Sequence, residues 1–178
     1  MHPKRTPFWF DCEPPISFAA LREEMTIDVA IVGGGTVGLH TAWFLSTLGL
    51  RIAVFEALQI GKQATGKSAG KITSQHGLRY AALIRYFGKE NAELYASANQ
   101  RAVNEIADLS LQIGTGHGLE PNPAYIYSRN DHEAEKLAEE AEAASSLGLP
   151  AYLITDASVL QADALSAVRF DHQYQIDP

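Results

Sequence analysis

The sequence predicts an α/β fold that begins with a parallel βαβ unit and continues into a mixed α+β region. First, a β-branched run, Ile27 to Val32, leads directly into three consecutive glycines. Second, a helical period follows, and another β-branched run, Arg51 to Phe55, completes the pattern within about thirty residues, as in a βαβ unit. Third, the strand patterns beyond residue 113 follow helices without another glycine turn, which indicates a different, mixed region.

The βαβ unit is expected to comprise a strand over residues 27–32, a helix over 36–48 and a strand over 51–55. A crossover of this kind is right-handed, so its two strands are parallel. The stretch from Val29 to Leu50 contains no Asp, Glu, Lys or Arg and is long enough for a membrane span. Three glycines near its start argue against a spanning helix, so we predict no integral membrane segment.

The remainder is predicted to alternate between loops, helices and strands. Residues 57–77 show no helical or strand period and predict a long loop, which inside a compact domain is usually functional. A helix is expected over 89–113, with a packed face formed by Tyr95, Ala98, Ala102, Ile106, Leu109 and Ile113. The elements expected after it are a loop over 114–123, strands over 124–128, 151–155 and 167–171, and a helix over 131–147 capped by Asn130 or Asp131.

The composition argues against several classes of partner and site. The chain has 14 basic and 21 acidic residues and a formal net charge of -7, so we expect no binding to nucleic acid. Cys12 is the single cysteine, which excludes an internal disulfide, a thiolate zinc site and an iron–sulfur cluster held by this chain alone. The histidines show no metal-ligand spacing, so no metal site is predicted. This cysteine usage fits a reducing compartment, the cytoplasm.

The glycines after the first strand match the spacing G-x-G-x-x-G at Gly33, Gly35 and Gly38. They stand between a predicted strand and a predicted helix, which is the context that a Rossmann-type dinucleotide site requires. Gly33 permits the tight turn, Gly35 lets the backbone approach a pyrophosphate, and Gly38 lets the helix pack closely on the strand. The phosphates would then lie at the amino terminus of the helix, beside Thr36 and Val37.

Two further features concern the choice of dinucleotide. Glu56 ends the second strand 18 residues after Gly38, where a carboxylate can accept hydrogen bonds from the adenosine ribose and repel the 2′-phosphate of NADP. The glycines and this acid do not separate FAD from NAD. The loop from Gly61 to Lys71 carries small residues, hydroxyls and cations, a composition suited to a diphosphate and a ribityl chain, and it favours FAD.

Longer stretches resemble a known family. The strings DVAIVGGGTVGL, VFEA and GKQATGKSAGKITSQHG resemble the D-amino-acid-oxidase-like (DAO) superfamily of FAD-dependent oxidoreductases, whose FAD-binding βαβ unit is Rossmann-like, of the glutathione-reductase type. More narrowly, KITSQHGL, FGKENAELYASAN, PAYIYS, LGLPA and VRFDHQYQIDP are similar to members that carry a Rieske iron–sulfur domain at their carboxyl end. The resemblance runs from about Phe8 to the last residue and covers only the front of the family pattern.

Carried over by position, this resemblance implies a set of FAD-binding residues. The pyrophosphate would be held by Gly33, Gly35 and Gly38, and the ribose by Glu56. The residues along the phosphates and the ribityl chain would be Thr65, Gly66, Lys67 and Ser68. The residues nearest the isoalloxazine would be Gly70, Lys71 and Ile72. This chain has Lys67-Ser68 where many relatives have Arg-Asn, so the contacts of that pair differ from the family pattern.

The resemblance also implies an enzyme that oxidises a C–N bond of an amine or amino acid by hydride transfer to flavin. It divides the chain into an amino-terminal arm over 1–26, an incomplete FAD-binding region over 27–113 and the beginning of a substrate, or cap, region over 114–178. A doubly wound sheet needs more strands than this chain supplies, so we interpret the chain as a fragment. Its expected partners are a small-molecule substrate and a carboxyl-terminal remainder or Rieske-type electron acceptor.

Two alternatives remain open at this point. The same fingerprint is found in NAD-linked dehydrogenases, and the chain could be a non-catalytic dinucleotide-binding fragment or subunit that another chain completes. The sequence also leaves the catalytic residues, the amine and the electron acceptor unidentified. His76, beside a glycine in SQHG, is a candidate acid or base, although a structural hydrogen-bonding role is the more common one for such a residue.

Overall fold

The structure is a computed structural model that describes residues 7, 10, 16–114, 118–157, 160 and 163–176. The chain divides into two compact units, Met1–Gly70 and Lys71–Asp177. This division by contacts places the long helix after residue 79 with the strands that follow it. The predicted functional division, with limits after residues 26 and 113, stays a prediction.

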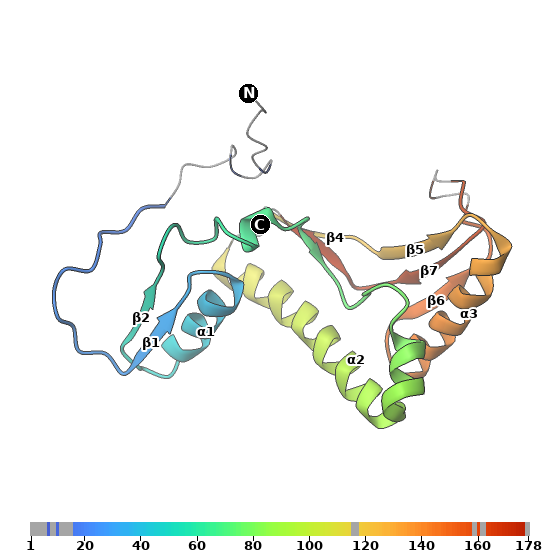
Figure 1. Ribbon diagram of the computed structural model, residues 1–178, viewed down its shortest axis with the longest axis horizontal. Coiled ribbons are helices and arrows are strands. Elements are labelled where there is room, and N and C mark those ends of the chain that lie inside the picture. Colours follow the sequence, from blue (N-terminus) through green and yellow to red (C-terminus); the bar gives the residue numbers. More distant parts are fainter. Residues whose placement is uncertain are drawn as a thin grey trace. The chain divides into compact units, whose positions relative to one another are not determined.

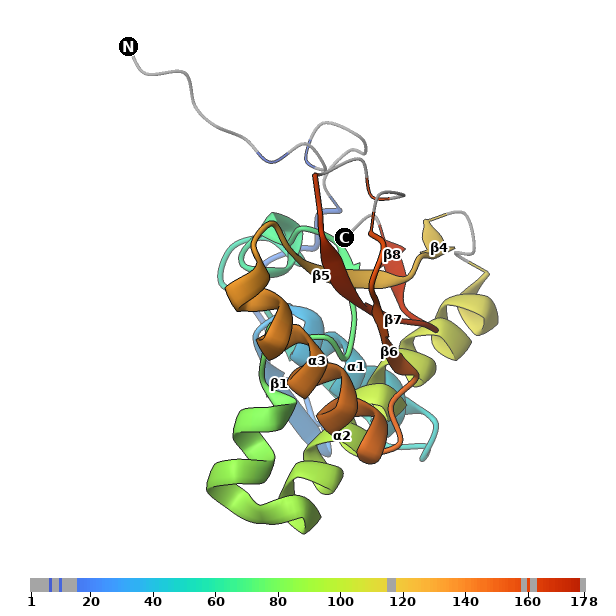
Figure 2. The same ribbon diagram turned by 90° about the vertical axis from the view of Figure 1, so that its right-hand side faces the viewer.

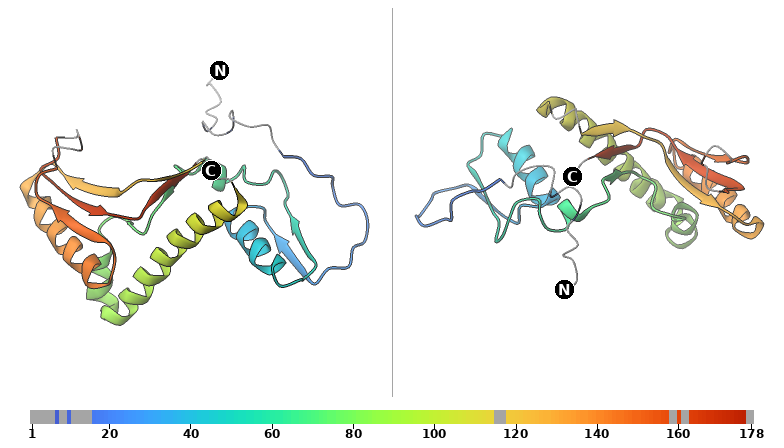
Figure 3. Two further views of the ribbon diagram at one scale, coloured as in Figure 1. Left: turned by 180° about the vertical axis from the view of Figure 1, so that it is seen from behind. Right: turned by 90° about the horizontal axis from the view of Figure 1, so that it is seen from above.

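The first unit contains the predicted parallel βαβ unit. Strand β1 (Val29–Val32) pairs in parallel with β2 (Ile52–Phe55), and α1 (Thr36–Ser46) connects them (Figure 1). The register runs from Val29 opposite Ile52 to Val32 opposite Phe55. Helix α1 lies along one side of this pair, which Figure 3 shows from behind and from above. The predicted strand–helix–strand order and parallel pairing are therefore confirmed.

Few apolar side chains of the first unit are buried. Among the described residues of β1 and α1, Ile31 alone is buried. Val32 is 88% exposed and Val37 is 81% exposed. A βαβ unit normally buries both faces of its strands, so these residues do not form a closed core within this unit.

Three short elements, one at the end of the first unit and two in the second, were not predicted from the sequence. The expected loop over 57–77 contains a 3-10 helix, η2 (Thr65–Lys67), and strand β3 (Lys71–Ile72), and the expected loop over 114–123 contains β4 (Leu119–Pro121). Strands β3 and β4 both pair antiparallel with β8 (Tyr174–Ile176), in the order β3-β8-β4. Figure 2 shows β8 beside β4. These strands are too short to show a period, and their pairing partner is distant in the sequence.

A second sheet has the order β5-β7-β6 and consists of β5 (Ala124–Ser128), β7 (Ser166–Phe170) and β6 (Ala151–Ile154), all antiparallel (Figure 1). The three predicted strands are confirmed to within one residue at each end. Helix α3 (Asp131–Ser146) covers one face of this sheet. Of the two predicted caps, Asn130 is the one observed, since its side chain accepts a hydrogen bond from the Glu133 amide at 3.0 Å.

Helix α2 (Tyr80–Ile113) begins nine residues before its predicted start at Lys89. It contains a kink at Gly88, whose φ of 79° lies in the left-handed region that favours glycine. The buried face is Ala92, Ala96, Val103, Ala107 and Ser110, so the predicted packed face was wrong. Of the predicted residues, Tyr95 is 38% exposed and Ile113 is 49% exposed. Small side chains let the helix approach its neighbours closely, and the large ones point elsewhere.

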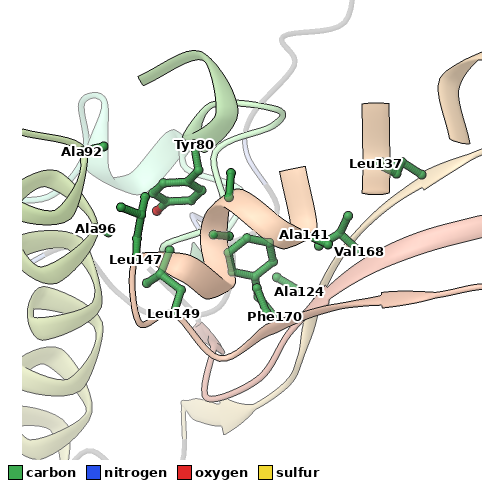
Figure 4. Packing of buried hydrophobic residues seen from close by; sticks show 13 residues of the cluster. Tyr80, Ala92, Ala96, Ala124, Leu137, Ala141, Leu147, Leu149, Val168 and Phe170 are labelled. Carbon is green, nitrogen blue, oxygen red and sulfur yellow. The ribbon is translucent and has the colours of Figure 1, made fainter. Parts of the chain in front are cut away.

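The core of the second unit lies between α2, α3 and the β5-β7-β6 sheet. Tyr80 from the first turn of α2 stacks on Phe170 of β7, with 6.1 Å between the ring centroids. Figure 4 shows Leu137 and Ala141 of α3 with Val168 of β7 in the same cluster. This core fixes the start of α2, and with it the segment between β3 and α2.

Candidate dinucleotide-binding site

The predicted glycine turn connects β1 to α1. The Gly33 amide continues the ladder by donating to the Phe55 carbonyl at 2.8 Å, and Gly33 then takes a φ of 108°. The Gly34 carbonyl accepts a hydrogen bond from the Gly61 amide at 2.9 Å, which ties the turn to the loop after β2. The chain enters the helix at Thr36. Gly33 therefore makes the tight turn for which the fingerprint requires its first glycine.

Gly38 lies in the first turn of α1, directly against the glycine turn. A Cβ atom on Gly38 would lie 1.9 Å from the Gly33 carbonyl oxygen and 3.3 Å from Cγ2 of Ile31. A Cβ on Gly35 would meet only the Thr65 hydroxyl, at 3.3 Å. Gly38 is thus required by packing within the protein, whereas the space at Gly35 remains open to a ligand.

The amino terminus of α1 carries no acidic residue in its first turn, and Gly35, the capping residue, has no side chain to cap it. The Thr36 amide donates to the Thr65 hydroxyl at 3.0 Å, and the hydroxyl oxygens of Thr36 and Thr65 are also 3.0 Å apart. Backbone N–H groups and the positive end of a helix dipole favour an anion at such a terminus. This terminus is therefore suited to a phosphate group.

A cavity of about 610 Å³ joins the glycine turn to the loop after β2. It is lined by Ile31, Val32, Gly33, Gly35, Thr36, Val37, Gly38, Thr41, Ala64, Thr65 and Ser68. Most of the residues predicted for the pyrophosphate and the ribityl chain thus lie around one space. The sequence prediction missed Ile31, Val32, Thr41 and Ala64 there, which carry no motif signal of their own.

Glu56 lies at the carboxyl end of β2 and interacts with the glycine turn. Its carboxylate accepts hydrogen bonds from the Gly34 amide at 2.8 Å and from the Leu58 amide at 2.9 Å. These two bonds, that from Gly34 first, lower the pKa of Glu56. The role of Gly34 was not predicted, although it is the middle residue of the triple glycine. A carboxylate has about four acceptor positions, so Glu56 can accept further bonds from a ribose.

A second cavity of about 670 Å³ lies alongside β2 and its carboxyl end and is lined in part by Glu56. Its other lining residues are Ile16 to Leu21, Met25, Ala53 to Phe55 and Ala57 to Ile60. Glu56 thus lies at this cavity and is hydrogen-bonded to the turn that lines the first one. Ligands of α/β sheets bind outside the carboxyl ends of the strands, where the first cavity lies, and the second cavity extends from that end along β2.

Three predicted residues of the loop do not line the first cavity. Gly66 is buried, and a Cβ on it would lie 2.5 Å from the Gly61 carbonyl oxygen and 2.6 Å from the ring of Phe10. Lys67 is exposed. Gly70 is buried and donates its amide to the Ser68 hydroxyl at 3.1 Å. Gly66 and Gly70 therefore determine the conformation of the loop. The predicted contact between Lys67 and the cofactor stays a prediction.

Lys71 and Ile72 form β3 at the start of the second unit. The Lys71 ammonium donates a hydrogen bond to the Gln75 side-chain oxygen at 2.7 Å. Burial lowers the pKa of this lysine. The role predicted for both residues beside an isoalloxazine stays a prediction.

His76 lies in the same unit and is 3.0 Å, through Nδ1, from the Tyr95 hydroxyl. Both roles considered for His76, structural hydrogen bonding and acid–base catalysis, stay predictions. Within the described part of the chain, no cluster of three or more His, Cys, Asp or Glu residues could hold a metal ion. Among the helices of the described ranges, none is long and apolar enough to cross a membrane.

Comparisons with known proteins identify related chains. A family model described as FAD dependent oxidoreductase (DAO) matches residues 28–178. A protein of Bacillus subtilis (strain 168) that carries the name of a Rieske 2Fe-2S iron-sulfur protein is 33% identical over 171 residues, covering 96% of this chain and 33% of that protein. The gamma-glutamylputrescine oxidoreductase of Escherichia coli (strain K12) is 25% identical over 149 residues, covering 84% of this chain and 35% of the enzyme.

The crystal structure of glycine oxidase from Bacillus cereus ATCC 14579 has a similar fold. Its TM-score is 0.63 at 24% sequence identity, and the match covers 85% of this chain and 40% of that enzyme. The chain spans about a third of the length of the two curated relatives. The name of the Bacillus subtilis relative agrees with the narrower resemblance found in the sequence.

Proposed function

Because the chain belongs to the DAO family of FAD-dependent oxidoreductases, we propose that it is the FAD-binding front part of a flavoenzyme that oxidises a C–N bond of an amine or amino acid. The family assignment favours FAD over the NAD-linked alternative. The names of two relatives, a glycine oxidase and a gamma-glutamylputrescine oxidoreductase, support an amine or amino-acid substrate. The single cysteine, Cys12, fits a cytoplasmic location as part of this proposal.

The observation that carries the proposal is the cavity shared by the glycine turn and the loop after β2. The residues around it fit a dinucleotide diphosphate, because backbone amides, the start of a helix and the hydroxyls of Thr36, Thr65 and Ser68 meet there. In the proposal, Gly33, Gly35 and the α1 terminus hold the pyrophosphate. Glu56 holds the ribose, and the cavity beside it has space for the adenosine half.

The chemistry comes from FAD, which when bound accepts a hydride from the carbon next to the substrate nitrogen. This chain binds and orients the dinucleotide, and Gly70, Lys71 and Ile72 face the isoalloxazine. The rest of the enzyme is proposed to lie in a carboxyl-terminal remainder. Two observations support this view. The βαβ unit leaves apolar side chains exposed, and the chain spans about a third of the length of its curated relatives. A Rieske-type centre is the proposed electron acceptor, on the strength of one relative's name.

The direct test is to identify the dinucleotide in the polypeptide produced from the native gene. We expect purified protein to be yellow and to release FAD on denaturation. Binding of NAD with no flavin would contradict the proposal, and so would the absence of any dinucleotide after titration with FAD. If FAD binds but no amine or amino acid reduces it, the alternative of a non-catalytic dinucleotide-binding subunit is favoured.

Replacing Glu56 with glutamine is expected to weaken FAD binding on the order of ten- to a hundredfold, since one charge-assisted acceptor for the ribose is lost. The amide also places an NH₂ group where a carboxylate oxygen accepts from the Gly34 or Leu58 amide. The dissociation constant is measured by flavin fluorescence titration. Glu93→Gln on the exposed face of α2 is the matched control and should bind FAD normally. Equal affinity in both variants would contradict the ribose assignment.

Replacing Lys71 with methionine is expected to lower the reduction potential of bound FAD. A cation beside the N1–C2 oxygen edge stabilises the negative charge of reduced flavin. Methionine has a side chain of similar length but lacks the positive charge of lysine. The potential is measured by anaerobic dye equilibration on the flavin-loaded protein, together with the half-reaction with an amine. The exposed Lys89→Met serves as control. If Lys71→Met leaves both quantities unchanged, Lys71 has no role at the flavin.

A further inference from the structure

The hydrogen-bond partner of Lys71 is a neutral side chain. The ammonium donates to Oε1 of Gln75 at 2.7 Å. Within the described part of the chain, Lys71 forms no ion pair, and burial is the cause of its lowered pKa. Lys71 is exposed as a residue, so its ammonium keeps access to solvent and to a ligand, and only its contact with the buried Gln75 removes part of its hydration. Here the positive charge has an acceptor but no compensating charge.

Gln75 is held in one orientation. Its side chain is 5% exposed, and its backbone amide donates to the Thr73 hydroxyl at 2.9 Å. The side-chain Nε2 lies 3.4 Å from the Gly77 carbonyl oxygen, while Oε1 faces Lys71. A flipped amide would place its NH₂ group against an ammonium and its oxygen against a carbonyl. The contacts of Oε1 with the Lys71 ammonium and of Nε2 with the Gly77 carbonyl therefore fix the orientation of the Gln75 amide.

The segment around this pair is itself fixed. Lys71 is paired in β3 with Gln175 of β8. The Ser74 amide donates to the side-chain oxygen of Gln173 at 2.6 Å, and the buried Tyr80 hydroxyl donates to the Ser74 carbonyl at 2.5 Å. A buried and satisfied hydrogen-bond network of this kind is rigid. Both Lys71 and Gln75 are thus attached to a segment with one well-defined backbone position.

We propose that Gln75 is a positioning residue that holds the Lys71 ammonium with a neutral acceptor and keeps its positive charge available to reduced flavin. The inference rests on the proposed function, in which Lys71 lies beside the isoalloxazine. Glutamine and glutamate have nearly the same shape, so only the charge of the acceptor distinguishes them here. A glutamate would bind the ammonium more strongly, but it would compensate the charge that the flavin is proposed to use.

The first measurement uses flavin-free protein and does not depend on FAD. Acetic anhydride at limiting concentration acetylates the neutral amine of each lysine, and mass spectrometry gives the rate at Lys71 relative to Lys89. Gln75→Glu is expected to slow acetylation of Lys71 about tenfold, since an adjacent carboxylate raises the lysine pKa by on the order of one unit. Gln75→Met removes the acceptor and is expected to speed it. Gln112→Glu on the exposed end of α2 adds the same charge elsewhere and should change nothing.

An unchanged rate at Lys71 in Gln75→Glu overturns the role of Gln75, whatever the flavin does. If circular dichroism shows that Gln75→Glu is misfolded, Gln75→Met takes its place. An unchanged acetylation rate at Lys71 in Gln75→Met then overturns the role of Gln75. A slower rate in Gln75→Glu that Gln112→Glu does not share supports the pair.

The second measurement is the reduction potential of the flavin-loaded protein. Gln75→Glu is expected to lower the potential more than Gln112→Glu does. The decrease caused by Gln75→Glu should be smaller in a Lys71→Met background than in the native background, because the two residues act together. A shift in Lys71→Met without a shift in Gln75→Glu overturns the role of Gln75. A change in acetylation with no shift in either variant overturns the flavin role of Lys71, and hence that part of the proposed function.

Discussion

Replacing Gly38 with alanine is expected to abolish FAD binding and to destabilise the βαβ unit. The added Cβ would lie 1.9 Å from the Gly33 carbonyl oxygen, a backbone atom that cannot rotate away. Separations under 3.0 Å are essentially never seen for real Cβ atoms, so the start of α1 or the glycine turn must move by about an ångström. Overpacking of this kind costs on the order of 1 to 3 kcal/mol.

Gly35→Ala is the matched comparison because its methyl group meets a different obstacle. In the protein, its Cβ would contact only the Thr65 hydroxyl, at 3.3 Å. The flavin-free variant should therefore keep nearly the native thermal stability but lose affinity for FAD, because the methyl group enters the space where backbone meets phosphate. Thermal unfolding of flavin-free protein and flavin titration together separate the two glycines.

Equal stability of the native protein and Gly38→Ala would contradict the close contact between α1 and the turn. Normal FAD binding by Gly35→Ala would contradict the assignment of the cavity to the diphosphate. Both substitutions are thus expected to weaken FAD binding, Gly38→Ala by distorting the protein and Gly35→Ala by occupying the space of the phosphate.

The parts of the fold that local sequence signals specify were predictable. The run from Ile27 to Val32, the triple glycine and the second strand predicted the parallel pair, and β5 was predicted with its observed limits. Asn130 as a cap was predictable because its side chain acts on an amide three residues away. In each case the residues that determine the structure are neighbours in the sequence.

The parts that were missed depend on distant residues. Strand β3 has two residues and is defined only by its pairing with β8, about a hundred residues later in the chain. The packed face of α2 was assigned to its large apolar residues, but alanines such as Ala92 and Ala96 fit the close contact with the second-unit core. Hydrophobicity gives the period of a helix, whereas the available space decides which face is buried.

The candidate site divides in the same way. The fingerprint glycines and Thr65 were predictable as a pattern, and they line one cavity. The hydrogen bond from the Gly34 amide to Glu56 was not predictable, because it joins a turn and a strand end that only the fold brings together. Lys71 was assigned by resemblance alone, and its neutral partner Gln75 became visible only in the structure.

The early start of α2 has a specific cause, and it leads to the second large expected effect. The carboxylate of Glu140 in α3 is fully buried and lies at the amino terminus of α2. It accepts hydrogen bonds from the amides of Arg79 and Tyr80, both at 2.9 Å, and of Ala81 at 3.0 Å. Arg79, at the capping position, makes no side-chain cap of its own. A residue from another helix therefore caps the first turn, which a local sequence signal could not reveal.

Replacing Glu140 with alanine is expected to destabilise the second unit on the order of 3 to 5 kcal/mol, because it leaves three amides at the helix start without their acceptor. Glu140→Gln retains one acceptor oxygen and should fall between alanine and the native protein. The control is its neighbour Glu139, whose ion pair with Arg85 has side chains 54% and 61% exposed. Glu139→Ala should cost less than about 1 kcal/mol.

Denaturant unfolding gives the loss of stability, and hydrogen exchange locates it. In Glu140→Ala the amides of Arg79, Tyr80 and Ala81 should exchange faster than in Glu139→Ala, while the middle of α3 keeps its protection until the unit unfolds as a whole. Similar losses in the alanine variants of Glu139 and Glu140 would show that the helix start is not held by this carboxylate. A local loss confined to the first turn of α2 would instead show that the cap fixes the segment after β3, in which Gln75 and Lys71 are placed.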